Sequence, residues 1–294
     1  MLRHHGRYEY SPITARPDFS WPDGKRLAVY VALGVEAYEF GEGMTENLVP
    51  GGEMSHDVLN ASWRDYGNRV GAWRVMDAMC ELGLPLTILL NTAVYDEAPA
   101  LAAAFRSNGC EIVAHGRSNS DTMAGMTEAQ ERSYIDGVTQ AIRAAEGQPP
   151  QGWASPWIAE TPTTPDSLHE AGYGYLLDWC MDDQPAWLRT RQGRLLSVPY
   201  SQEINDSSTI IGRMASAAEF ADMIVDQFEQ LLENSQQQPL VMSVILHSFI
   251  AGQPFRLRRI RQALAHIASR RSELWLTTPG EIAAFIHANP EHAR

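Results

Sequence analysis

The length of the chain allows one large domain or two small ones, and its charge excludes some partners. It has 294 residues, 44% of them hydrophobic, and a formal net charge of −13. We therefore expect neither nucleic acid nor an anionic membrane surface as a partner. The 3 cysteines form no Cys-x-x-Cys pair, which is typical of reduced thiols in a cytoplasmic protein. The polar N-terminus does not resemble a signal peptide, and no apolar run reaches the roughly 18 residues of a membrane span.

Apolar stretches typical of buried strands alternate along the chain with amphipathic stretches of helical spacing. Residues 1–26 are polar and proline-containing, so we expect an irregular N-terminal arm there. A loop rich in Gly and Pro follows Glu36 and ends near Leu59, and loops of this length in compact domains are usually functional or disordered. Strands are predicted at 27–35, 85–90, 112–114, 152–155, 175–177, 195–198, 240–246 and 273–276, and helices at 67–82, 96–107, 127–146, 165–171, 216–234, 255–269 and after Thr278.

This alternation predicts an α/β fold with a parallel sheet. For a single domain of this length, a (β/α) barrel of seven or eight strands fits better than an open sheet. No GxGxxG turn follows the first strand, which weakens a dinucleotide-binding interpretation. We expect the arm at 1–26, the barrel at 27–287 and a C-terminal tail at 288–294. Residues that follow barrel strands gather at one face, and here they are Glu36, His115, Trp157, Asp178, Glu203 and His247.

Two of these residues follow particularly apolar strands. Glu36 comes directly after the apolar run 27–35, and removal from water would raise the pKa of its carboxyl group towards that of a general base. The alternative is a salt bridge with a nearby arginine. His247 follows the most apolar strand, where a polar ring is costly without a partner. We interpret it as a general acid that protonates a leaving nitrogen, or as a group that stabilises an oxyanion.

His115 ends another strand, in the sequence His115-Gly-Arg-Ser-Asn119. Three roles stay open for it: a metal ligand, an acid/base, or a hydrogen-bonded core histidine. His-x3-Asn is a weak zinc signal, because an amide oxygen is a poor zinc ligand. If the protein binds a divalent, zinc-like ion, the candidate ligands are His115, Asn119 and Glu36, brought together from separate loops.

The remaining candidates are substrate-binding residues. Trp157 could stack on a flat ring, or it could simply pack in the core. Asp178 and Asp182 could bind substrate or hold a histidine in one tautomer, although aspartates are also common turn residues. Glu203 follows a predicted strand, and Arg256 closes the turn Gly252-Gln-Pro-Phe-Arg256, where it could meet a carboxylate at a helix N-terminus.

Four motifs in this order make the chain resemble the polysaccharide deacetylase (NodB-homology, carbohydrate esterase family 4) superfamily. It looks most similar to the branch that holds the metal-independent allantoinases and cyclic imide hydrolases. The resemblance covers roughly residues 20–287. The motifs are Leu33-Gly-Val-Glu-Ala-Tyr38, His115-Gly-Arg-Ser-Asn119, Ala154-Ser-Pro-Trp157, and Leu246-His247-Ser with Gly252-Gln-Pro-Phe-Arg256.

The resemblance implies a single-domain, distorted (β/α)7-type barrel. Deacetylases of this family use an aspartate base, an Asp-His-His metal site and a histidine acid. By position, Glu36 takes the place of the base, His247 that of the acid and His115 that of the first metal histidine. Tyr38 stands where a metal-binding aspartate can stand, and Asn119 replaces the second metal histidine. The third motif also lacks the arginine that family deacetylases pair with the base.

These departures favour a small cyclic amide or imide, such as a hydantoin, allantoin or succinimide, over a cell-wall glycan. We expect ring opening in which Glu36, helped by His115, activates water and His247 protonates the leaving nitrogen. A metal, or polar donors around Asn119, would polarise the carbonyl group. Two alternatives are a metal-dependent N-deacetylase of a small amino sugar or glycan, and a non-catalytic ligand-binding barrel. The proline-rich arm and surface aromatics predict a homo-oligomer, a dimer or a tetramer.

Overall fold

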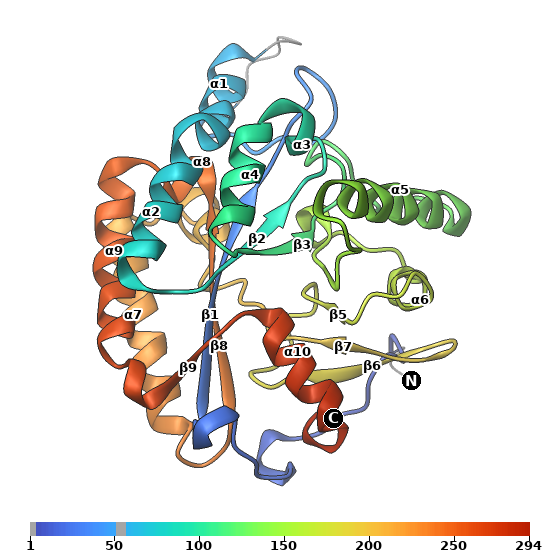
Figure 1. Cartoon of the computed structure of the whole chain (residues 1–294), viewed down its shortest axis with the longest axis vertical. Coiled ribbons are helices and arrows are strands. Elements are labelled where there is room, and N and C mark those ends of the chain that lie inside the picture. The colour runs from blue at the N-terminus through green and yellow to red at the C-terminus, as the bar shows by residue number, and fades with distance from the viewer. Residues whose placement is uncertain (1–3, 51–56) are drawn as a thin grey trace.

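A single curled sheet runs through the molecule, shown in Figure 1 as a computed structural model that describes residues 4–50 and 57–294. The predicted loop after Glu36 is therefore described only in part. Within these ranges the strand order is β6-β7-β5-β4-β3-β2-β1-β8, with β9 also paired to β1. All neighbours are parallel except β6 and β7. The strands are β1 (Leu27–Val35), β2 (Leu86–Leu90), β3 (Glu111–Ala114), β4 (Gly152–Trp153), β5 (Tyr175–Leu176), β6 (Ala186–Thr190), β7 (Gly193–Ser197), β8 (Leu240–His247) and β9 (Leu274–Leu276).

The two ends of the sheet approach each other. After β7 the chain runs along the outer edge of β8, where Asn205 forms a parallel bridge with Ile245. The backbone N–H of Ile245 also donates to the carbonyl of Ile204 at 2.9 Å. The sheet is thus a curled, incompletely closed barrel, which confirms the predicted α/β class and single-domain, distorted (β/α) barrel.

Helices cover the outside of the curled sheet. In Figure 1, α2, α7 and α9 stand along β1 and β8, whereas α5 and α6 lie on the opposite side of the molecule. None of the helices in the described ranges is long and apolar enough to cross a membrane. The helices are α1 (Val58–Tyr66), α2 (Ala72–Leu82), α3 (Val94–Glu97), α4 (Pro99–Ser107), α5 (Glu128–Glu146), α6 (Thr164–Glu170), α7 (Ala217–Asn234), α8 (Ser248–Ala251), α9 (Pro254–Ser269) and α10 (Pro279–Ala288).

The alternation of side chains along β1 separates two cores. All nine residues of the strand are buried. Leu27, Val29, Val31, Leu33 and Val35 pack in one core with residues of α2, α7 and α9. The residues between them, such as Tyr30, pack in a second core that includes Trp21 of the arm and residues of α10. Because side chains alternate between the two faces of a strand, position 36 continues the second, inward-facing series.

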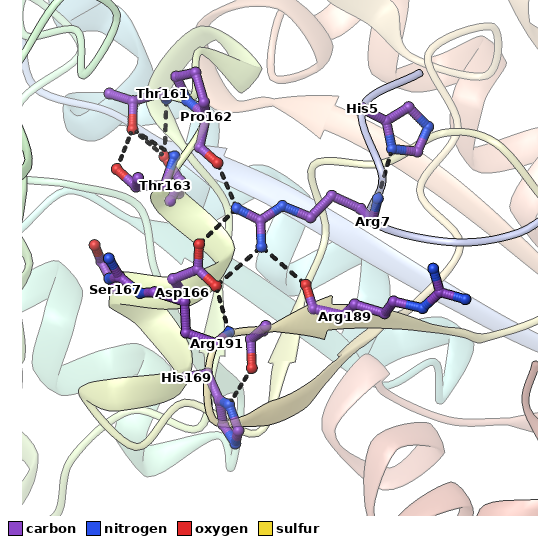
Figure 2. Close-up of polar contacts among 12 residues, drawn as sticks. His5, Arg7, Thr161, Pro162, Thr163, Asp166, Ser167, His169, Arg189 and Arg191 are labelled. Carbon is purple, nitrogen blue, oxygen red and sulfur yellow. Dashed lines mark hydrogen bonds and ion pairs between the residues drawn. The ribbon is translucent and has the colours of Figure 1, made fainter. Parts of the chain in front are cut away.

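The N-terminal arm is tied to the edge of the sheet (Figure 2). The guanidinium group of Arg7 donates to both carboxylate oxygens of Asp166 at 3.0 and 2.7 Å, and to the carbonyls of Pro162 and Arg189. The backbone N–H of Arg189 returns a bond to the carbonyl of Arg7, and that of Trp187 donates to Arg294 at the other end of the chain. Both chain ends thus cover the edge strand β6, which would otherwise expose unpaired backbone groups.

Most predicted strands and helices are present with shifted ends, and the described residues form one further strand and two further α-helices. The helix predicted at 127–146 is α5, which begins one residue later and is preceded by a capping box of Thr127 and Gln130. Strand β6 and helices α1 and α8 were not predicted. Part of β6 is exposed at the sheet edge and carries Arg189, so it lacks the continuous apolar run of a central parallel strand.

Candidate active site

Four polar side chains lie at the carboxyl ends of adjacent strands. Glu36 follows β1, Asn91 follows β2, His115 follows β3 and His247 ends β8. These strands are neighbours in the order β3-β2-β1-β8, so their ends meet at one edge. Of the four, Glu36, Asn91 and His115 are buried, and the side chain of His247 is 12% exposed. The barrel therefore gathers a carboxylate and two imidazoles where (β/α) barrels place their sites.

Glu36 lies between the two histidines. Its Oε1 is 3.5 Å from Nε2 of His247 and 3.6 Å from Nε2 of His115. Its Oε2 accepts a hydrogen bond from the Tyr38 hydroxyl at 2.5 Å. The Asn68 side chain donates to the Glu36 backbone carbonyl at 2.8 Å, which fixes the turn after β1.

The charge around Glu36 reverses one expectation. Burial raises the pKa of its carboxyl group, but the imidazole of His247 and the hydrogen bond and charge of His115 outweigh burial, so the pKa lies below its ordinary value. The prediction of a raised pKa for Glu36 was therefore wrong, because it considered burial without the two imidazoles that β3 and β8 bring close. The consequence is a carboxylate that stays ionised at neutral pH.

His247 is held by a second carboxylate, that of Asp206. Nδ1 of the ring lies 2.7 Å from Oδ1 of Asp206, and the His247 backbone N–H donates to Oδ2 at 3.0 Å. Nδ1 therefore carries a proton, and Nε2 faces Glu36. Burial lowers the pKa of His247, but the carboxylates of Glu36 and Asp206 outweigh it and raise that pKa to about 10. The ring is thus a cation that can release a proton from Nε2.

His115 is oriented by the backbone rather than by a carboxylate. Its Nδ1 lies 2.8 Å from the carbonyl oxygen of Ala154, which can only accept, so Nδ1 is the donor. The Asn91 side chain holds the backbone of the same residue by donating to its carbonyl. Nε2 is therefore the ring nitrogen that faces Oε1 of Glu36.

The arrangement around Asn119 does not match a zinc ligand set. Its side-chain oxygen accepts a bond from Asn91 at 3.1 Å, and its side-chain nitrogen is 3.5 Å from the Tyr38 hydroxyl. Tyr38 itself donates to Glu36. Across residues 4–50 and 57–294, no three His, Cys, Asp or Glu side chains are grouped to hold a metal ion. An amide and a neutral phenol are weak replacements for the acidic and imidazole ligands of zinc, so we derive no step through a metal.

Trp157 lies beside this group. Its indole N–H donates to the backbone carbonyl of Asn119 at 2.7 Å. Both Trp157 and Ile158 have positive φ, at 61° and 53°. Such backbone conformations cost on the order of 1–3 kcal/mol for non-glycine residues and persist only where surrounding contacts impose them. The stacking role of Trp157 stays a prediction.

Asp178 is buried and belongs to a carboxyl pair that the sequence did not suggest. Its Oδ1 accepts from the backbone N–H of Ser155 at 2.7 Å, whereas its buried Oδ2 has no donor among the described side chains and backbone unless a carboxyl group is protonated. Burial and the neighbouring Asp178 carboxylate raise the pKa of Glu160 to about 10. A proton on Glu160 supplies the donor that Asp178 lacks. Asp178 follows the carboxyl end of β5, in the same sheet as β3 and β8, so it lies at the same edge as the histidines.

The other three predicted substrate-binding residues make no direct contact with Glu36 among the described hydrogen bonds and ion pairs. Asp182 forms a two-pronged ion pair with Arg16 of the arm, both contacts at 2.6 Å. Glu203 is exposed and pairs with Arg213 at 2.6 Å. Arg256 is buried, with the carbonyl of Ile250 at 3.5 Å from its Nη1. The structure thus does not bring Asp182 or Glu203 into the group around Glu36, whereas the charge of Arg256 interacts with that of Asp206, which holds His247.

Asp206 and Asn91 are functional residues that the sequence analysis missed. Asp206 lies three positions after Glu203, and the bridge at Asn205 places it against β8. The same polar segment offered both carboxylates, and nothing in its pattern distinguishes the exposed Glu203 from the buried Asp206. Asn91 could have been found, because it directly follows an apolar strand in the manner of Glu36 and His115.

The comparisons with known proteins agree with this geometry. Residues 52–176 match the family model described as polysaccharide deacetylase. A putative polysaccharide deacetylase of Schizosaccharomyces pombe is 25% identical over 305 aligned residues, which cover 92% of each chain. Over these residues the chain is thus similar to polysaccharide deacetylases.

Solved structures share this fold along almost the whole chain. A structure of PuuE allantoinase superposes with a TM-score of 0.81 at 26% identity and covers 98% of each chain. A probable polysaccharide deacetylase from Pseudomonas aeruginosa PAO1 gives 0.79 at 25% identity, covering 92% of this chain and 94% of that one. The likeness therefore includes the arm and all the strands that build the site, and it supports a hydrolase acting on C–N bonds.

Proposed function

We propose that this protein opens the ring of a small cyclic amide or imide by hydrolysing a C–N bond. The observation that supports this most is the Glu36–His247 pair. The two groups lie 3.5 Å apart and hold opposite charges. An ionised carboxylate is ready to accept a proton, and a protonated imidazole is ready to give one, so the resting site already holds a general base and a general acid.

The reaction follows from these protonation states. A water molecule between Glu36 and His115 gives one proton to Glu36 Oε1 as its oxygen attacks the ring carbonyl carbon. The second O–H of that water stays intact, and Nε2 of His115, which lies 3.6 Å from Oε1 of Glu36, orients it. When the ring C–N bond breaks, the leaving nitrogen takes the proton from Nε2 of His247. Asp206 stabilises the His247 cation throughout, as a carboxylate does for a catalytic histidine.

The ring-opening proposal draws on the allantoinase likeness and on the site. The neighbour named PuuE allantoinase matches at full length. The third motif of this chain, Ala154-Ser-Pro-Trp157, contains no arginine that could pair with Glu36. A second candidate is a metal-dependent N-deacetylase of a small amino sugar, which the family match and the Schizosaccharomyces pombe relative favour by their names.

Product mass spectrometry separates the two candidates. The purified protein is incubated with hydantoin, allantoin, succinimide, glutarimide and N-acetylglucosamine oligomers, each with added zinc and with chelator. For a cyclic amide or imide we expect a ring-opened product that is heavier than the substrate by one water, with no second fragment. We expect the rate with chelator to equal the rate with added zinc. Release of acetate that depends on zinc would instead identify a deacetylase. Turnover of no compound in any condition would count against both enzymes and favour the non-catalytic barrel.

A further inference from the structure

The loop after β1 is hydrogen-bonded to the segment that follows β3 and His115. The Ser120 hydroxyl accepts from the backbone N–H of Glu39 at 2.8 Å, and the Ser120 carbonyl accepts from that of Met44 at 3.0 Å. Between them Gly43 has φ of +69°, and a Cβ at this position would lie 2.3 Å from the Ser120 carbonyl oxygen. Only glycine fits so close an approach with that backbone.

Side chains of α1 hold the next part of the same loop. Nη1 of the buried Arg64 donates to the carbonyl of Glu46 at 2.8 Å and to the Asn47 side chain at 3.0 Å. The guanidinium group also lies over the ring of Tyr38, 4.8 Å from its centroid. Because Tyr38 donates to Glu36, this loop and the general base share one supporting cluster.

The carboxylate of Glu46 is directed to the acid side of the site. Both of its oxygens lie within hydrogen-bond distance of one donor, the Ser207 hydroxyl, at 2.8 and 3.0 Å. Ser207 directly follows Asp206, the residue that holds His247. One hydroxyl has one hydrogen, so it satisfies a single lone pair, and no Lys, Arg or His of the described chain forms an ion pair with Glu46. The carboxylate therefore keeps acceptor capacity for another molecule.

The charges near His247 specify what that molecule can be. The carboxyl groups of Glu36, Asp206 and Glu46 all act on this one imidazole. Burial and the carboxylates of Glu36 and Asp206 raise the pKa of Glu46, whereas the His247 cation opposes them. A carboxylate on a substrate would add a further negative charge here and be repelled. A neutral group with N–H donors would instead satisfy the free lone pairs of Glu46.

We propose that Glu46 is a specificity-determining residue that accepts N–H bonds from a neutral substituent of the ring and disfavours rings that carry a carboxylate. This inference rests on the proposed ring-opening function and assigns the substrate class of the same site. It predicts that the substituent, and not the reacting ring, is what Glu46 recognises. Any effect of its charge on His247 is common to all rings, so the preference between substituted and unsubstituted rings is what Glu46 should determine.

The test compares three hydantoins in wild type and in Glu46→Gln. Allantoin carries a neutral ureido group, hydantoin carries no substituent, and hydantoin-5-acetate carries a carboxylate. For Glu46→Gln we expect the ratio of kcat/KM for allantoin to that for hydantoin to fall about tenfold or more, mainly through the KM for allantoin. We expect the ratio of kcat/KM for hydantoin-5-acetate to that for hydantoin to rise. Glu42→Gln is the matched control, because Glu42 is exposed on the same loop.

The outcomes separate this inference from the proposed function. Equal ratios among the three substrates in wild type and Glu46→Gln would overturn the role of Glu46 while leaving ring hydrolysis in place. Absence of turnover of every ring by the wild type would overturn both. If Glu46→Gln loses its cooperative melting transition, the same three rates in Glu46→Asp decide, since that change keeps the charge and withdraws it by one methylene group.

Discussion

A carboxylate serves as a general base only while it is ionised, and an imidazole serves as a general acid only while it is protonated. In this chain Glu36 and His247 stabilise the charged form of each other. The His247 cation lowers the pKa of Glu36, and the carboxylates of Glu36 and Asp206 raise that of His247. The roles thus follow from how these three residues are placed.

Replacing the base tests that assignment. Glu36→Gln keeps the shape of the side chain and removes the proton acceptor, so we expect kcat to fall by about 10²- to 10⁴-fold. Glu39→Gln is a fair control, because Glu39 is an exposed carboxylate three residues along the same turn that pairs with Arg117. Initial rates on the ring that the wild type opens are the measurement. Near-native turnover by Glu36→Gln would remove Glu36 from the mechanism.

At single positions the sequence was informative only where the backbone pattern was simple. Glu36, His115 and His247 all follow apolar strands, and the alternation of a strand then determines which face they share. Glu203 and Asp206 lie in an irregular segment with no such period, so the sequence pattern does not tell the exposed Glu203 from the buried Asp206. Glu46 and Glu160 belong to loops, and their positions depend on contacts with distant side chains such as Ser207 and Asp178.

At the level of elements, the pairing of β1 with β8 brings Glu36 and His247 together. Gly34 of β1 pairs with His247 of β8. A Cβ at Gly34 would lie 3.0 Å from Cδ2 of His247 and 3.1 Å from Oε1 of Glu36. The absence of a side chain at this position therefore lets the acid and the base meet across the strand pair.

Adding a methyl group at this point should affect activity more than folding. We expect Gly34→Ala to displace Glu36 or His247 and reduce kcat by roughly 10²-fold, with a loss of about 1–3 kcal/mol in the free energy of unfolding from overpacking. Gly137→Ala is the matched control, because Gly137 is exposed on α5 with open space around it. Chemical denaturation and initial rates are measured for both. Full activity in Gly34→Ala would show that the two strands tolerate a wider separation.

Elements were predictable where one period ran without interruption. The strand predicted at 27–35 has the bounds of β1, since each of its nine residues is buried. The helix predicted at 127–146 likewise agrees with α5 to within one residue. The helix predicted at 67–82 is instead a π-helical turn, Gly67–Gly71, followed by α2. Gly71 packs where a Cβ would lie 2.0 Å from the Ser248 carbonyl, a tertiary constraint that no local period reveals.

On the scale of the whole molecule, the alternation of strands and helices was enough to predict the curled α/β barrel. It could not show how the two ends of the curled sheet approach each other, because irregular segments make these contacts. Asn205 bridges to β8, and residues near both chain ends cover β6. The arm contributes Arg7 and Arg16 as ion-pair partners of Asp166 and Asp182, which explains why Asp182 is not free for a substrate. The homo-oligomer and the cytoplasmic location stay predictions.

The pH dependence of kcat/KM tests the central claim most directly. Activity requires Glu36 without its proton and His247 with one. Lowering the pH protonates Glu36 only below the ordinary carboxyl range, and raising the pH deprotonates His247 only near 10. We therefore predict a plateau that spans neutral pH and ends with a basic limb near pH 10. A basic limb near 6.5, the ordinary value of a histidine, would contradict the account, because His247 would then be largely neutral at pH 7.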